Sequence, residues 1–99
     1  MNIRFRDVSS GIVEARAIIE LAPGIYINEI TILRKNHEII VELPKKSFKG
    51  RNGRIHHIDI LTFESENKKI LWIYEIKAEY KKWRKKNRKV LVYESESEE

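Results

Sequence analysis

The residues best suited to chemistry in this sequence are lysines and arginines crowded near its C-terminus. Residues 68–89 contain ten Lys or Arg against two Glu, whereas the last ten residues contain four Glu and no basic residue. Cationic side chains at this density attract anionic polymers and bind phosphate groups. The segment predicts contact with nucleic acid, and a solvated helix face without a ligand is the alternative. The residues expected to contact phosphate are Lys77, Lys81, Arg84, Lys85 and Arg88.

A second basic segment, residues 44–54, reads as the longest loop. It contains five cationic residues and no acid. Gly50 and Gly53 allow the backbone to approach a ligand closely, and Phe48 is able to stack on a base. We expect the loop to support phosphate binding, and a mobile, soluble loop is the alternative. Its cationic residues are Lys45, Lys46, Lys49, Arg51 and Arg54.

Catalytic and metal-binding patterns are weak in this chain. It has no cysteine, so disulfides, thiolate nucleophiles and Cys-ligated zinc are excluded. His56 and His57 are adjacent on an expected strand and point to opposite faces, so they cannot chelate one metal together. Asp59 is better placed as a structural hydrogen-bond acceptor than as a catalytic base. We therefore expect no enzyme activity, no metal, no cofactor and no small-molecule substrate.

The elements that must position these residues follow from hydrophobic periodicity. Alternation with period two predicts half-buried strands. It is clearest over residues 12–21, where one face carries Glu14, Arg16 and Glu20 and the apolar face carries Val13, Ala15, Ala17, Ile19 and Leu21. The expected strands are residues 2–8, 12–21, 25–33, 38–43 and 55–63. Ser65 is a suitable N-cap for a helix over residues 66–88. The chain is thus predicted to be a single α+β domain over residues 1–89, an antiparallel sheet of about five strands followed by one long helix. An acidic tail over residues 90–99, expected to be disordered, completes it.

The expected helix has an apolar face and further apolar residues outside it. Projection at 100° per residue gathers Trp72, Ile73, Ile76, Tyr80 and Trp83 on the face that should pack on the sheet. Ile70, Leu71 and Tyr74 lie outside that arc, and one small sheet covers only one side of a helix. We therefore predict a homodimer in which a second subunit covers Ile70, Leu71 and Tyr74.

Several short motifs resemble the SpoVG family (stage V sporulation protein G, also called septation protein). Residues 27–32, INEITI, are similar to the family's V-x-D-I-R-V strand, and residues 40–46, IVELPKK, to its strand ending in F-V-x-M-P before basic residues. Asp59-Ile60 and Ala78-Glu79-Tyr80 are similar to its D-I-x-H-P segment and A-E-Y helix. The resemblance covers residues 13–82 and departs at Thr62-Phe63, where the family has His-Pro.

The resemblance implies a small α+β fold and a cytoplasmic, homodimeric regulator of gene expression that binds DNA or RNA, with family roles in septation, cell division and sporulation. By position it adds Lys68 and Lys69 to the expected binding residues.

The main alternative is a protein-interaction module whose basic helix binds an acidic partner. A membrane-surface binder is less favoured, because the basic half of the helix lacks a broad apolar face once Tyr80 and Trp83 pack on the sheet.

Overall fold

Four consecutive strands form an antiparallel sheet in the order of the sequence. In the computed structural model these strands are β1 (Ile3–Ser10), β2 (Val13–Ala22), β3 (Ile25–Lys35) and β4 (Glu38–Glu42). The structure describes residues 1–97, with side chains described through residue 87. A two-residue turn joins β3 to β4, and both its residues, Asn36 and His37, have positive φ (50° and 68°). This is the turn geometry whose twist suits an antiparallel hairpin.

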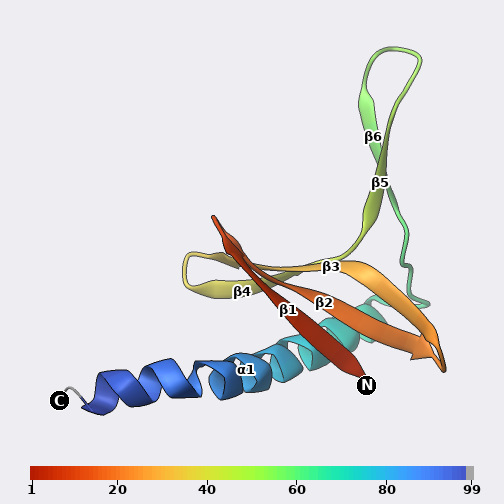
Figure 1. Ribbon diagram of the computed structural model, residues 1–99. Coiled ribbons are helices and arrows are strands. Elements are labelled where there is room, and N and C mark those ends of the chain that lie inside the picture. The colour runs from red at the N-terminus through yellow and green to blue at the C-terminus, as the bar shows by residue number, and fades with distance from the viewer. Residues whose placement is uncertain (98–99) are drawn as a thin grey trace.

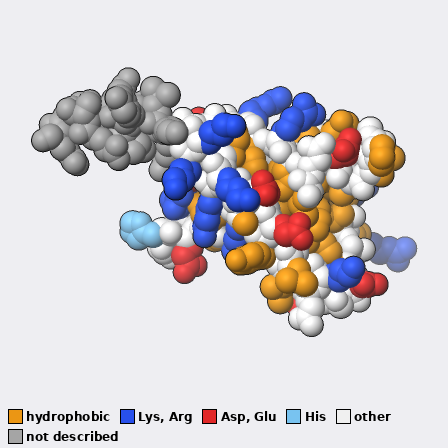
Figure 2. Space-filling model, turned by 90° about the horizontal axis from the view of Figure 1, so that it is seen from below, with side chains coloured by type: hydrophobic (Ala, Val, Ile, Leu, Met, Phe, Trp, Pro, Cys, Tyr) orange, Lys and Arg blue, Asp and Glu red, His pale blue; other side chains and the backbone are white. Residues whose placement is uncertain are grey.

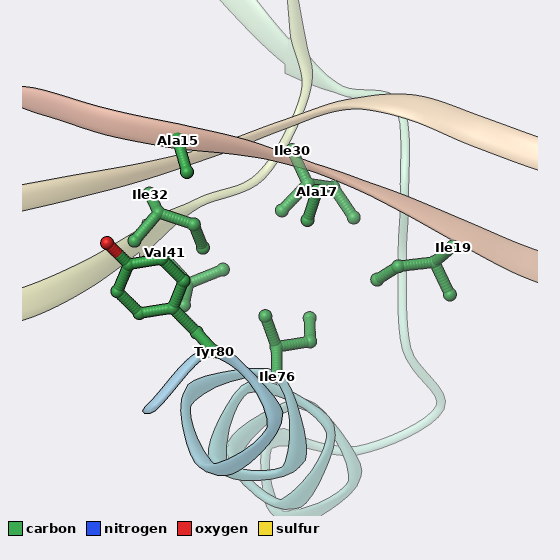
Figure 3. Close-up of a cluster of buried hydrophobic side chains, with 8 residues drawn as sticks. All are labelled: Ala15, Ala17, Ile19, Ile30, Ile32, Val41, Ile76 and Tyr80. Atoms are coloured by element: carbon green, nitrogen blue, oxygen red, sulfur yellow. The ribbon is translucent and has the colours of Figure 1, made fainter. Parts of the chain in front are cut away.

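The core lies between this sheet and the helix that follows it along the chain. Alternation along β2 places Ala15, Ala17 and Ile19 on the helix-facing side, where they are buried. Ile76 and Tyr80 reach them from the helix (Figure 3). The remaining buried members of the cluster are Ile30, Ile32 and Val41. The fold class, α+β, is confirmed. The predicted core face of β2 is confirmed at Ala15, Ala17 and Ile19 but is wrong at Leu21, which is 50% exposed at the end of the strand.

Helix α1 (Glu66–Ser97) follows the sheet and lies across one of its faces (Figure 1). Ser65 caps it, because its Oγ accepts a hydrogen bond from the backbone N–H of Lys68 at 3.1 Å. Trp72 and Trp83 are partly buried against the core, as their spacing predicts. The helix passes its predicted end at residue 88, since no Gly or Pro interrupts residues 89–97. Side chains beyond residue 87 lie outside those described, and the predicted disorder of residues 90–99 stays a prediction.

The predicted loop over residues 44–54 is wrong in part, because it contains a strand. Residues Lys45–Lys49 form β5, which pairs antiparallel with β6 (Ile55–Asp59). The described chain therefore has six strands rather than about five, and β6 ends before the predicted residue 63. The β5–β6 hairpin forms a separate two-stranded sheet that rises away from the four-stranded one (Figure 1). Its turn closes when the N–H of Gly50 donates to the carbonyl of Arg54 at 2.8 Å.

Candidate nucleic-acid interface

The second half of α1 carries an exposed group of lysines, which we call the distal lysines: Lys77, Lys81, Lys82, Lys85 and Lys86. All are exposed except Lys77, which is partly buried. Figure 2, which views the helix side of the molecule, shows Lys and Arg side chains gathered on this part of the surface. The only ion pair that the described residues make with this group joins Lys82 to Glu79 at 3.7 Å. The other four ammonium groups are therefore available to an external anion.

Arg84 lies among the distal lysines but differs from them in its contacts. Its Nε donates to the Tyr80 hydroxyl at 3.0 Å, and its Nη2 donates to Asp7 at 3.2 Å and to the backbone carbonyl of Glu14 at 3.3 Å. The guanidinium also lies 4.7 Å from the centre of the Trp83 ring. The side chain is only 14% exposed. This geometry favours an anchoring role for Arg84 over the phosphate contact that the sequence predicts.

Glu14 joins this anchor to a second arginine. Its carboxylate accepts hydrogen bonds from Arg34 Nε at 2.6 Å and from the Tyr80 hydroxyl. The hydrogen bond from Arg34 holds the pKa of Glu14 below its ordinary value of 4.5, against the opposing effect of burial. Burial, followed by the hydrogen bond to Glu14, raises the pKa of Tyr80. The cluster thus keeps a carboxylate and a neutral phenol at neutral pH, and it ties α1 to the sheet.

A register shift explains how Glu14 reaches the helix side of the sheet. Strict alternation along β2 would place it opposite Ala15, on the face that turns away from α1. The pairing of β2 with β3 shifts between Val13 and Ala15. Such an irregularity re-aims a side chain within a strand. Sequence reasoning therefore missed Glu14 and Arg34, which are 20 residues apart and carry no local motif.

A groove separates the distal lysines from the β3–β4 turn. It has a volume of about 1100 Å³, with Tyr80 and Ile39 among its lining residues. Its cationic lining comprises Arg34, Lys77, Lys81, Lys82, Arg84, Lys85 and Lys86. The lining also includes His37 and, as the single acid among the described side chains, Glu38. A groove with this lining is suited to an extended anion such as a phosphodiester chain. His37 was not predicted as a site residue. Its one distinguishing feature is its place in the β3–β4 turn, where it has a positive φ.

The other predicted cationic residues lie elsewhere. Those of the hairpin, Lys45, Lys46, Lys49, Arg51 and Arg54, are all exposed. Figure 1 shows the hairpin rising from the sheet well away from the distal half of α1, so the structure does not bring the two basic segments together. Lys68 and Lys69 lie in the first turn of α1, where Lys68 pairs with Glu64 at 3.5 Å. The side chain of Arg88 lies outside those described.

Three further features bear on the remaining predictions. Ile70, Leu71 and Tyr74, the predicted dimer contact, are exposed on the first half of α1. Within the residues described, no cluster of three or more His, Cys, Asp or Glu is arranged to hold a metal ion. The described part of the chain also contains no helix with the length and apolar character needed to cross a membrane.

The fold and the groove together define an α+β domain with one cationic helix end. Comparisons with family models, curated proteins and solved structures find no match to this chain. The resemblance to the SpoVG family therefore stays a prediction.

Proposed function

We propose that this protein is a non-catalytic, cytoplasmic nucleic-acid-binding regulator similar to SpoVG proteins, working as a homodimer. The observation that carries the proposal is the set of distal lysines beside the groove, four of which have no ion-pair partner among the described residues. Like charges this close on a helix repel one another, which costs helix stability. A polyanion in the groove would remove that cost and release its own counterions.

The distribution of acids supports the same reading. The acids of this region mostly bind other residues: Glu14 binds Arg34, and Glu79 binds Lys82. Among side chains up to residue 87, only that of Glu38 places a carboxylate in the groove lining. Because most of the nearby carboxylates pair with other residues, the described groove lining keeps a net positive charge that a ligand can neutralise. The phosphate contacts give affinity and register but little sequence discrimination.

A protein-interaction module that binds an acidic partner is the alternative function. The same exposed lysines would serve it, so the geometry of the groove alone does not separate the two. Binding to arbitrary DNA or RNA that weakens steeply with salt favours nucleic acid. Absence of binding to either polymer at low salt favours the acidic protein partner.

The test is a salt titration of binding to single- and double-stranded DNA and RNA, with Lys81→Gln/Lys85→Gln as the variant. If all five distal lysines contact phosphate, duplex affinity falls about 500-fold between ~50 and ~200 mM salt, and about 40-fold in the double variant. Arg6→Gln/Arg16→Gln is the matched control. These exposed residues pair across β1 and β2 on the sheet face away from α1, and their replacement removes the same charge. Equal salt slopes for the two variants would refute the groove assignment.

A further inference from the structure

The β5–β6 hairpin has no core of its own. Every residue of both strands is exposed. A two-stranded hairpin in water is at best marginally stable without a hydrophobic surface to pack against. Nothing in the hairpin contributes to the buried cluster between sheet and helix. A stably folded arm of this kind needs a surface outside the described fold.

The two faces of the hairpin differ in chemistry. On one face, Lys45 lies opposite Asp59, and Ser47 is hydrogen-bonded to His57 at 2.9 Å. The other face carries Phe48 stacked on His56, with ring centres 5.2 Å apart, and Ile58 on the same side. Ile58 is 53% exposed, and Ile60, just beyond β6, is 56% exposed. Lys46 lies opposite Ile58 on this face, so Phe48, Ile58 and Ile60 form an apolar column with a cationic side chain beside it. The opposite face of the hairpin carries one large apolar side chain, Ile55.

The first half of α1 presents a complementary surface. Leu71 and Tyr74 are 63% and 69% exposed, and Ile70 lies beside them. Glu66 and Glu75 flank these apolar side chains on the helix. Both acids are exposed, and neither forms an ion pair with a described residue. Lys77, three residues after Tyr74, borders the same surface at its other end. The acids Glu66 and Glu75 thus match the cationic edge of the hairpin's apolar face.

We propose that the hairpin of one subunit packs through Phe48, Ile58 and Ile60 onto Ile70, Leu71 and Tyr74 of a second copy of this chain. The two surfaces cannot meet within one chain as it is folded, because the hairpin rises away from the sheet while α1 lies below it (Figure 1). In a two-fold dimer each chain supplies both halves, so the contact forms twice. Isoleucine side chains gain little from contact with a phosphate backbone, which favours a protein surface over nucleic acid for this face.

The inference deepens the homodimer of the proposed function and is independent of its nucleic-acid role. Sedimentation without nucleic acid is able to refute the hairpin contact while salt-dependent binding through the distal lysines persists. Conversely, a dimer that binds no nucleic acid would leave this contact intact. The two failures are therefore distinguishable.

Sedimentation velocity at micromolar concentration is the first measurement. The full chain should sediment as a dimer, and Ile58→Ser should raise the dimer dissociation constant about tenfold or more. Ile55→Ser is the matched control, since Ile55 lies on the opposite face of the same strand and is 68% exposed. It should leave the constant unchanged. A monomeric full chain, or equal effects of the two substitutions, would overturn the proposal.

The absence of native cysteine allows a second test that identifies the partner surface. Ile58→Cys chains labelled with nitrogen-15 are mixed with unlabelled Leu71→Cys chains and oxidised mildly. The contact predicts a labelled–unlabelled disulfide, because cysteine pairs only when the two backbones are close. Ile55→Cys should cross-link poorly in the same mixture. Cross-linking of Leu71→Cys only to itself would show a helix–helix dimer instead and would overturn the role of the hairpin.

Discussion

The Glu14 cluster offers the sharpest test of how the sheet holds the helix. Glu14→Gln keeps the shape of the side chain and an acceptor for the Tyr80 hydroxyl but removes the charge that binds Arg34. A hydrogen bond involving a charged group contributes about 1.5–3 kcal/mol. The Glu14 side chain is 17% exposed, whereas that of Arg34 is 39% exposed and can be rehydrated, which reduces the loss. We therefore expect the free energy of unfolding to fall by about 1.5–2 kcal/mol, equivalent to roughly 6–16 °C in Tm.

The pH dependence makes this prediction specific to the carboxylate. Because the hydrogen bond from Arg34 lowers the folded pKa of Glu14 below 4.5, its stabilisation is fully present above pH 4.5. It is lost as the pH falls through the lowered folded pKa. The wild-type chain and Glu14→Gln should thus differ at pH 7 and converge in acid.

Urea unfolding followed by tryptophan fluorescence suits this comparison, because Trp72 and Trp83 pack against the core. All samples need equal protein concentration, since association would shift the apparent stability. Glu29→Gln is the control: Glu29 is an exposed residue of β3 with no ion pair among the described residues, and its replacement should have little effect. A difference between wild type and Glu14→Gln that is absent at pH 7, or that persists undiminished in acid, would refute the reasoning.

Substitutions at two further positions test local conformation. His37→Gly should stabilise the chain by about 0.5–1 kcal/mol in thermal unfolding, because His37 has a φ of 68° that glycine adopts without cost; a loss of stability would show that the side chain makes compensating contacts. Ser65→Ala should lower the free energy of unfolding by about 1 kcal/mol, because it removes the acceptor for the Lys68 N–H. Ser65→Thr keeps a hydroxyl acceptor and should retain most of the wild-type stability. Equal unfolding midpoints for the alanine variant and the wild type would contradict the capping role.

Periodic patterns in the sequence predicted the parts of this fold that periodicity controls. The alternation of Ala15, Ala17 and Ile19 identified the core face of β2, and the spacing of Ile76 and Tyr80 identified the packing face of the helix. Each of these signals is local, since it depends only on the period of a strand or helix. The exposed state of Ile70, Leu71 and Tyr74 also follows from the same projection.

Features that depend on pairing between distant segments were missed. β5 reads KKSFK, whose charges and single aromatic residue give little strand signal. It becomes a strand because β6 completes its hydrogen bonds. Glu14 was placed on the outer face because a register shift cannot be read from alternation alone. Because this shift brings Glu14 to the helix side of the sheet, the contacts among Glu14, Tyr80 and Arg84 were missed as well.

The structure divides the cationic residues of the groove by side-chain type. Arg34 and Arg84 bind acids and the Tyr80 hydroxyl, and both are partly buried. The planar guanidinium donates several hydrogen bonds in fixed directions, which suits it to such an anchor, whereas an ammonium is more strongly hydrated and stays at the surface. A charge count from the sequence gives both types equal weight, yet among the described residues the groove cations without an ion pair include four lysines, Lys77, Lys81, Lys85 and Lys86, and neither arginine. Arg84→Lys should therefore impair stability more than nucleic-acid affinity, whereas Lys81→Gln should do the reverse.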